Sequence, residues 1–150
     1  GVRIISPLEK LYLTIKKLNL TIKENKFYFE KAFLKGIPVE GMINLQNQLF
    51  GLEINYEKLN AIDFKKGCYV GQENTARMKL KKKIRRQLMS IKTEKNVKIG
   101  DEIKYNENTI GKILIDKPYP FALIKLFDPE FNIFKDKKLK IHDNNVEIIS

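Results

Sequence analysis

The sequence predicts an α+β fold in which a first, partly helical region is followed by a small antiparallel β-barrel. Apolar residues recur at helical spacing over residues 7–18, which indicates an amphipathic helix. From residue 84 onward, short segments rich in β-branched and aromatic residues alternate with Gly, Asn, Asp or Pro, a pattern typical of a small barrel or sandwich. The chain has 150 residues, of which 43% are hydrophobic, so it can bury a core as one domain or two small ones.

The first region begins with a helix-start pattern. Ser6 is expected to cap the helix over about 7–18, with Pro7 in the first turn and Glu9 at the capping-box position. Asn25 is expected to cap a second helix over 26–35, which ends at Gly36-Ile37-Pro38. The other segments are assigned from residue type: short strands at 2–5 and 20–22, irregular chain over 39–56, and a helical turn at 57–61.

The second region is expected to contain five short strands, at 84–91, 102–105, 109–115, 121–126 and 146–149. Asn106-Glu107-Asn108 is a suitable hairpin turn between the second and third of them. A charged stretch precedes the first strand. We therefore predict a domain boundary near 80–84, with one domain over 1–83 and a barrel domain over 84–150.

Net charge is concentrated in one segment of the chain. The sequence carries 29 Lys+Arg and 18 Asp+Glu, a formal net charge of +11, and residues 65–92 supply +9 of it. Either this segment forms a solvated lysine-rich face, or it meets an anion: a small anionic ligand, an acidic protein or, less favoured, a nucleic acid. Aromatic residues do not alternate with these cations, so the sequence does not favour direct binding of nucleic acid.

Several classes of site are absent from the sequence. The single cysteine, Cys68, and the single histidine, His142, cannot form an internal disulfide or a complete zinc or iron–sulfur site in one chain. The sequence has no P-loop, dinucleotide fingerprint or nucleophile elbow. No apolar run reaches the ~18–20 residues that span a bilayer, so no membrane partner is expected. One cysteine suits a reducing compartment.

The densest group of chemically capable residues is Asp63-Phe64-Lys65-Lys66-Gly67-Cys68-Tyr69-Val70-Gly71-Gln72-Glu73. Gly71 can lead into a helix from about Gln72 to Met78, which places Cys68 near a helix N-terminus and two lysines. Both surroundings favour the thiolate, which is the nucleophile and metal ligand. The alternative is a small buried cysteine in a tight turn, which is common for unpaired cysteine.

The segment Lys-Gly-Cys-Tyr-Val-Gly-Gln-Glu, residues 66–73, resembles the signature of the YgfZ family. These are folate-binding proteins related to the glycine-cleavage T protein, an aminomethyltransferase, and they serve iron–sulfur protein maturation. Further similar elements are Gly36-Ile37-Pro38, the segment from Glu53 and Asn55 to Phe64, the run from Arg77 to Leu88, and Gly100–Ile103 with Ile110–Ile113. The resemblance covers about residues 25–150.

The resemblance implies a C-terminal portion of such a protein, because full-length relatives carry further residues before the first one here. The chain starts at Gly1 rather than Met, which agrees with that expectation. The implied fold is part of a T-protein-like lobe, ferredoxin-like α+β, followed by the barrel. Ala32 and Leu34 stand where the wider superfamily often has Arg and Glu before the glycine, and that Glu helps to hold the pterin. This departure puts folate binding by this chain alone in question.

The resemblance also implies roles for the signature residues. Cys68 is the reactive thiol and a candidate transient cluster ligand, and no other metal site is expected. The loop or ligand residues are Lys65, Lys66, Gly67, Tyr69, Gly71, Gln72, Glu73 and Arg77, with Glu73 and Arg77 spaced to pair on a helix. The implied cofactor is tetrahydrofolate, and the implied partners are iron–sulfur assembly or client proteins.

The function favoured by the resemblance is a non-enzymatic accessory factor for [4Fe–4S] protein maturation or repair. One alternative is a tetrahydrofolate-dependent aminomethyltransferase, which would make the protein a one-carbon transfer enzyme. The cysteine signature belongs to the YgfZ branch and argues against it. A second alternative is a role associated with tRNA modification. The implied compartment is the cytoplasm of a bacterium, or the mitochondrial matrix in a eukaryote.

Overall fold

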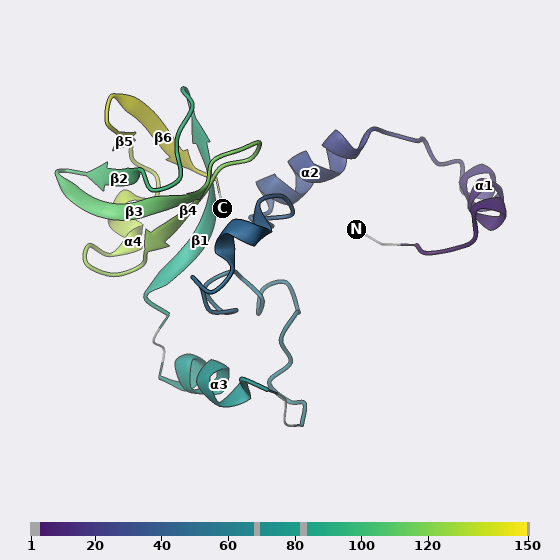
Figure 1. Ribbon diagram of the computed structural model, residues 1–150, viewed down its shortest axis with the longest axis horizontal. Helices are drawn as coiled ribbons and strands as arrows, with labels where there is room; N and C mark the ends of the chain where they lie inside the picture. Colours follow the sequence, from purple (N-terminus) through teal and green to yellow (C-terminus); the bar gives the residue numbers. More distant parts are fainter. Residues whose placement is uncertain (1–3, 68–69, 82–83, 150) are drawn as a thin grey trace.

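The computed structural model of the protein describes residues 4–67, 70–81 and 84–149, and it confirms the α+β class with a closed barrel (Figure 1). The helices are α1 (Leu8–Lys17), α2 (Asn25–Leu34), α3 (Gln72–Leu80) and α4 (Phe131–Phe134), with a 3₁₀ turn η1 at Met42–Leu45. The strands are β1 (Arg86–Thr93), β2 (Glu102–Tyr105), β3 (Asn108–Ile115), β4 (Phe121–Lys125), β5 (Leu139–Ile141) and β6 (Asn144–Ile148).

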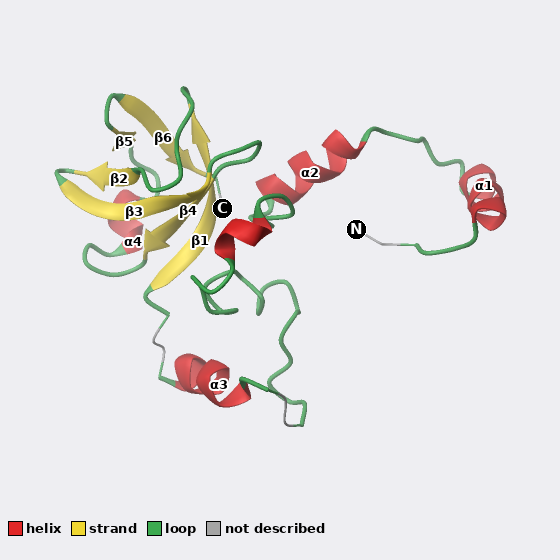
Figure 2. Ribbon diagram, in the orientation of Figure 1, coloured by secondary structure: helices red, strands yellow, loops and turns green. Residues whose placement is uncertain are grey.

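The barrel closes in the strand order β1-β4-β3-β2-β5-β6, with every neighbouring pair antiparallel (Figure 2). Alternate residues of the strands point inward, so Ile91, Ile103, Ile113 and Ile124 are fully buried in its centre. A second apolar cluster lies under the first region of the chain and includes Leu88, Ile115 and Phe121 with Leu45 and Ile54. This second cluster fixes residues 45–54 on the barrel.

The hairpin between β2 and β3 has a two-residue turn. Tyr105 pairs with Asn108, and the two residues between them, Asn106 and Glu107, have φ values of 46° and 70°. Positive φ at both central positions defines the turn geometry whose twist matches an antiparallel hairpin. The predicted turn at 106–108 is therefore confirmed.

A close approach between β3 and β4 requires glycine at position 111. A Cβ there would lie 2.6 Å from Ile124 Cδ1 and 3.0 Å from the backbone oxygen of Leu123. Because the oxygen belongs to the β4 backbone, the strands must separate to accept an alanine. We expect Gly111→Ala to lower the free energy of unfolding by about 1–3 kcal/mol in urea titrations. Gly67→Ala is the control, since a Cβ there has no neighbour within 4 Å; an equal loss in both variants would contradict the prediction.

Two barrel elements were not predicted from the sequence. Helix α4 places Phe134 in the barrel core, where it is fully buried and its ring centroid lies 6.1 Å from that of Tyr105 and 5.5 Å from that of Phe131. Strand β5 has only three residues and follows directly after a lysine-rich turn. The five-strand prediction is corrected to six, because β5 is required to close the barrel between β2 and β6.

The first region contains the predicted helices with different starts. Pro7, not Ser6, occupies the N-cap of α1, and the Ser6 hydroxyl donates to the Pro7 carbonyl at 3.3 Å, so the predicted Ser6 cap is wrong. Asn25 is the first residue of α2, and Glu24 precedes it as the N-cap. At the helix end, Gly36 has a φ of 67°, and the Ile37 N–H donates to the Ala32 carbonyl at 2.9 Å. This left-handed C-cap explains the Gly-Ile-Pro terminus.

Two other local predictions differ from the structure, and a third agrees with it. Residues 20–22 form no strand, because none of the described strands pairs with them. The predicted strand at 2–5 lies partly outside the described residues, and Ile4 and Ile5 are not in a strand. The helical turn predicted at 57–61 agrees with the structure, where the Leu59 N–H donates to the Asn55 carbonyl at 2.9 Å and the Asn60 N–H donates to the Glu57 carbonyl at 3.1 Å.

Helix α2 contacts the barrel through one aromatic side chain. The Phe33 ring lies 5.3 Å from the Tyr119 ring and 5.6 Å from the Phe121 ring, the latter pair edge to face. Phe121 is buried in the second apolar cluster, so Phe33 connects α2 to that core. Helix α1 lies beyond α2, at the far end of the molecule from the barrel (Figure 1). None of the described helices is long and apolar enough to cross a membrane.

Candidate functional site

The signature residues lie in a segment that leaves the barrel and returns to it. We call residues 56–85 the signature arm; α3 is its helix and lies below the barrel in Figure 1. Cys68 and Tyr69 lie outside the described residues. Of the other predicted site residues, Lys65, Lys66, Gly67, Gly71, Glu73 and Arg77 are exposed and Gln72 is half-buried.

Gly71 sets the start of α3. Its φ is 85°, a left-handed conformation that strains any residue with a side chain, and its carbonyl accepts from the Thr75 hydroxyl at 3.2 Å and the Thr75 N–H at 3.4 Å. The helix predicted from Gln72 to Met78 therefore forms and extends to Leu80. Gly67 lies in open space and does not have positive φ.

Lys79 connects α3 to the preceding part of the arm. Its ammonium forms an ion pair with Glu57 and lies 3.9 Å from the centroid of the Phe64 ring. Just before the signature, the Asp63 carboxylate accepts from the Lys65 N–H at 2.8 Å and makes a local turn. These contacts bring the two sides of the arm together around the signature. Among the ion pairs of the described residues none joins Glu73 to Arg77, so the predicted pair is not formed.

An ion pair between a buried glutamate and a half-exposed arginine closes the base of the arm. The Glu53 side chain is only 5% exposed, and it receives Arg86 Nε at 3.0 Å and Arg86 Nη2 at 3.3 Å, one on each carboxylate oxygen. The Phe50 N–H also donates to Glu53 Oε2, at 3.0 Å. This forked arginine–carboxylate geometry is the strong form of such a pair. It joins the chain just before the arm to the first residue of β1.

Asn55 extends this connection. Its side-chain amide nitrogen donates to the Leu88 carbonyl at 3.0 Å, and its Oδ1 accepts from the Gln87 side-chain amide. The Leu88 N–H in turn donates to the Glu53 carbonyl at 2.7 Å. We refer to Glu53, Asn55, Arg86, Gln87 and Leu88 together as the clamp. Both ends of the signature arm therefore leave the barrel at one point. The sequence resemblance includes these residues, but nothing in residue type or spacing predicted that they contact one another.

The cations of the basic segment have two different roles. Arg86 and Lys79 are engaged with Glu53 and Glu57, so they are part of the arm's framework. Five other cations are exposed on the described part of the arm: Lys65, Lys66, Arg77, Lys81 and Arg85. The local excess of positive charge therefore faces solvent around the signature, where an anionic group can approach.

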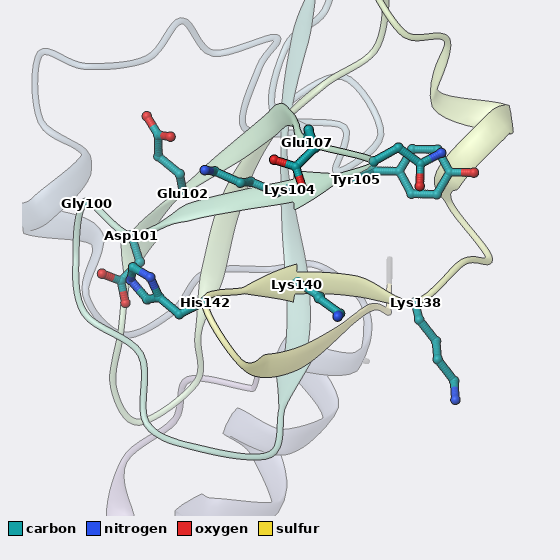
Figure 3. Close-up of a pocket in the computed structure, with 10 residues that line it drawn as sticks. Gly100, Asp101, Glu102, Lys104, Tyr105, Glu107, Lys138, Lys140 and His142 are labelled. Carbon is teal, nitrogen blue, oxygen red and sulfur yellow. The ribbon is translucent and has the colours of Figure 1, made fainter.

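One surface pocket among the described residues lies on the barrel, away from the signature arm. It has a volume of about 780 Å³ and lies over β2 and β5, with Glu102, Lys104, Lys140 and His142 at its wall (Figure 3). Acidic and basic side chains alternate there, and Glu102 already accepts from the Thr109 hydroxyl at 2.9 Å. The wall includes no residue of the clamp or of the signature.

The two positions where the resemblance expects pterin contacts carry apolar side chains. Ala32 is buried, Leu34 is exposed, and neither can bond a pterin through its side chain. The three pockets found on the barrel are lined only by residues between 92 and 148. Within the described ranges no group of three His, Cys, Asp or Glu side chains is placed to hold a metal ion.

Comparison with known proteins gives the relatives of the chain. No family model matches it. It is 34% identical over 114 residues to the "tRNA-modifying protein YgfZ" of Buchnera aphidicola (Baizongia pistaciae), covering 68% of this chain and 36% of that protein. It is 36% identical over 104 residues to the mitochondrial "iron-sulfur cluster assembly factor IBA57 homolog" of Neurospora crassa, covering 69% and 21%. The corresponding protein of Dictyostelium discoideum is 33% identical over 108 residues, which cover 68% of this chain and 26% of that protein.

The mixed α+β fold with its closed barrel, together with these relatives, places the chain in the class of T-protein-like proteins. Within that class, the chain belongs to the YgfZ family, which includes the mitochondrial IBA57 proteins. The chain spans about a third or less of the length of the relatives that it matches here.

Proposed function

We propose that this chain provides the signature arm and barrel of an accessory factor for the maturation or repair of iron–sulfur proteins. The relatives named as iron–sulfur cluster assembly factors support this assignment. The observation that carries it structurally is the clamp, in which the buried Glu53 side chain pairs with the half-exposed Arg86 and holds the signature arm at one point of the barrel. Such a closed base fixes the position from which the arm meets a partner.

The proposed function can be tested in cells. In a bacterial strain that lacks its own YgfZ-family protein, the chain is expected to raise the activity of a [4Fe–4S] enzyme several-fold above the empty vector. Cys68→Ala is expected to remove this gain at equal protein level. Met78→Ala, on the same arm, is the control and is expected to retain it. Equal activity with Cys68→Ala would contradict the role of the thiol, and no gain from the unchanged chain would contradict the function.

Cys68 is proposed as the reactive group, with Lys65 and Lys66 acting as positioning residues that favour its thiolate. Nearby cations stabilise the charged form and therefore lower the thiol pKa. We expect the alkylation rate of Cys68 to reach half its maximum below the ordinary value of about 8.5. Replacing both lysines with alanine should move that midpoint upward, and Lys58→Ala, farther along the arm, should not. A midpoint at or above about 8.5 in the unchanged chain would remove the activation argument.

Tetrahydrofolate is the proposed ligand of the assembled protein, by family membership. Because Ala32 and Leu34 offer no polar contact, the isolated chain is expected to bind tetrahydrofolate only weakly, with a Kd above about 1 mM in calorimetry. Saturable binding at micromolar concentration would show that this chain holds the ligand through other residues. Turnover of tetrahydrofolate with an aminomethylated carrier protein is expected to be absent, and its presence would favour the transferase alternative.

The name of the Buchnera relative connects that protein to tRNA modification. We propose that any such link of this chain is indirect and passes through iron–sulfur client proteins. Gel-shift titration with bulk tRNA at low salt should then show no specific binding. Tight binding that weakens steeply with added salt would instead assign the exposed arm cations to phosphate contacts.

A further inference from the structure

Two lysines stand opposite each other on the outside of the barrel, where β2 meets β5. The registered pair that joins these strands is Lys104 with Lys140, and both residues are exposed. Like charges directly opposite each other on neighbouring strands destabilise a sheet. Figure 3 shows the two ammonium groups turned in different directions, and the ion pairs of the described residues include neither lysine. Within the described part of the chain, therefore, no carboxylate is bound to this pair.

Charged pairs elsewhere in the described barrel have an acidic partner. Two registered pairs join opposite charges: Lys92 with Glu147, and Lys112 with Glu102. A second pair of cations, Arg86 with Lys125, lies at the start of β1, and there the Glu53 carboxylate binds Arg86. Lys104 and Lys140 lack such a carboxylate, so this position can accept one from another molecule.

A third lysine continues the cationic row along β5. Lys138 precedes the strand and Lys140 lies two residues further on, so the two are about 7 Å apart along an extended chain. Leu139 and Ile141 are buried in the barrel, which leaves the lysines on its outer face. All three lysines line the pocket of about 780 Å³. An extended peptide has the same two-residue period, so carboxylates on alternate residues match the spacing of the lysines.

We propose that this face of β2 and β5 binds an extended acidic segment of a partner protein, with Asp or Glu at alternate positions. Nucleic acid fits less well, because its phosphates carry a single sign of charge and Asp101, Glu102 and Glu107 line the same pocket. A peptide can direct acidic residues to the lysines and a basic residue to those carboxylates. The pocket includes no residue of the clamp or of the signature, so the site is independent of the role proposed for Cys68.

The test measures the binding of a fluorescein-labelled peptide of alternating Glu and Ser to the chain, by fluorescence anisotropy at low salt. Micromolar binding is expected. Lys104→Glu and Lys140→Glu should each weaken it at least tenfold, because each places a negative charge against the peptide. Lys117→Glu is the matched control, since it changes the net charge equally at an exposed position outside the pocket, and it should weaken binding less than threefold. A peptide of the same composition with contiguous glutamates should bind several-fold more weakly.

Lys104→Glu also gives a measurement that needs no ligand. It places a carboxylate opposite Lys140, so the thermal unfolding midpoint of the chain alone should rise by roughly 1–3 °C. A rise would also show that lost binding does not come from misfolding, and a lower midpoint would contradict the repulsion between the two lysines.

Four results of the binding measurements would overturn the proposal. The first is no binding of the alternating peptide at low salt. The second is an equal loss in Lys117→Glu and Lys104→Glu, which would reduce the binding to overall charge. The third is equal binding of both peptides. The fourth is binding of bulk tRNA that is tighter than that of the peptide and is lost in Lys104→Glu, which would assign the face to nucleic acid.

Discussion

Replacing Arg86 with alanine is expected to lower the free energy of unfolding by about 2–4 kcal/mol, because it leaves the buried Glu53 carboxylate without its partner. The cost comes from the glutamate, which is already removed from water. The Phe50 N–H remains bonded to it and offsets only part of the loss. Urea unfolding followed by circular dichroism measures the change.

Arg85→Ala is the matched control for this prediction, because Arg85 is the adjacent, exposed arginine. It is expected to change stability by less than about 0.5 kcal/mol. The double variant Glu53→Ala with Arg86→Ala should be less destabilised than the sum of the two single variants, since neither charge is then left alone. Equal effects of Arg85→Ala and Arg86→Ala would mean that the ion pair does not hold the arm to the barrel.

Phe134→Ala is expected to destabilise the protein by about 3–5 kcal/mol, because it opens a cavity where α4 fills the barrel. Phe134 is fully buried in the barrel core, against Tyr105 and Phe131. Thermal and urea unfolding should both register the loss.

Ile133→Ala is the control on the same helix, since Ile133 is about half exposed. It is expected to cost less than about 1 kcal/mol. Phe134→Leu should fall between the two, because it keeps most of the apolar contact. If Phe134→Ala lowered the free energy of unfolding no more than Ile133→Ala, α4 would not be part of the barrel core.

The sequence predicted best those elements whose signals are local. Strands β2 and β3 were placed within a residue of their ends, because alternating apolar residues flank the Asn-Glu turn. Helix α4 and strand β5 were missed because each has four residues or fewer, and lysines surround Leu139 and Ile141. Their structure depends on burial inside the barrel, which is a tertiary effect. The strand predicted at 20–22 failed for the opposite reason: its β-branched residues favour a strand locally, but no neighbouring strand pairs with them.

The candidate site was predictable only in part. Gly71 and the helix after it follow from local sequence. The clamp does not, because Glu53 and Arg86 are 33 residues apart and a charge pattern cannot choose partners at that distance. Arg86 belongs to a run of similar cations, and only the fold shows that this one pairs with Glu53. The resemblance marked both residues without indicating that they pair.

The clamp also allows the arm to change in length without changing the barrel. Residues 53–55 contact residues 86–88 directly, so the chain between them is a loop with both ends fixed at the barrel. Doubling such a loop costs only about 0.6 kcal/mol of closure entropy. Insertions or deletions within 56–85 can therefore alter which partner the arm reaches while the barrel keeps its strand register.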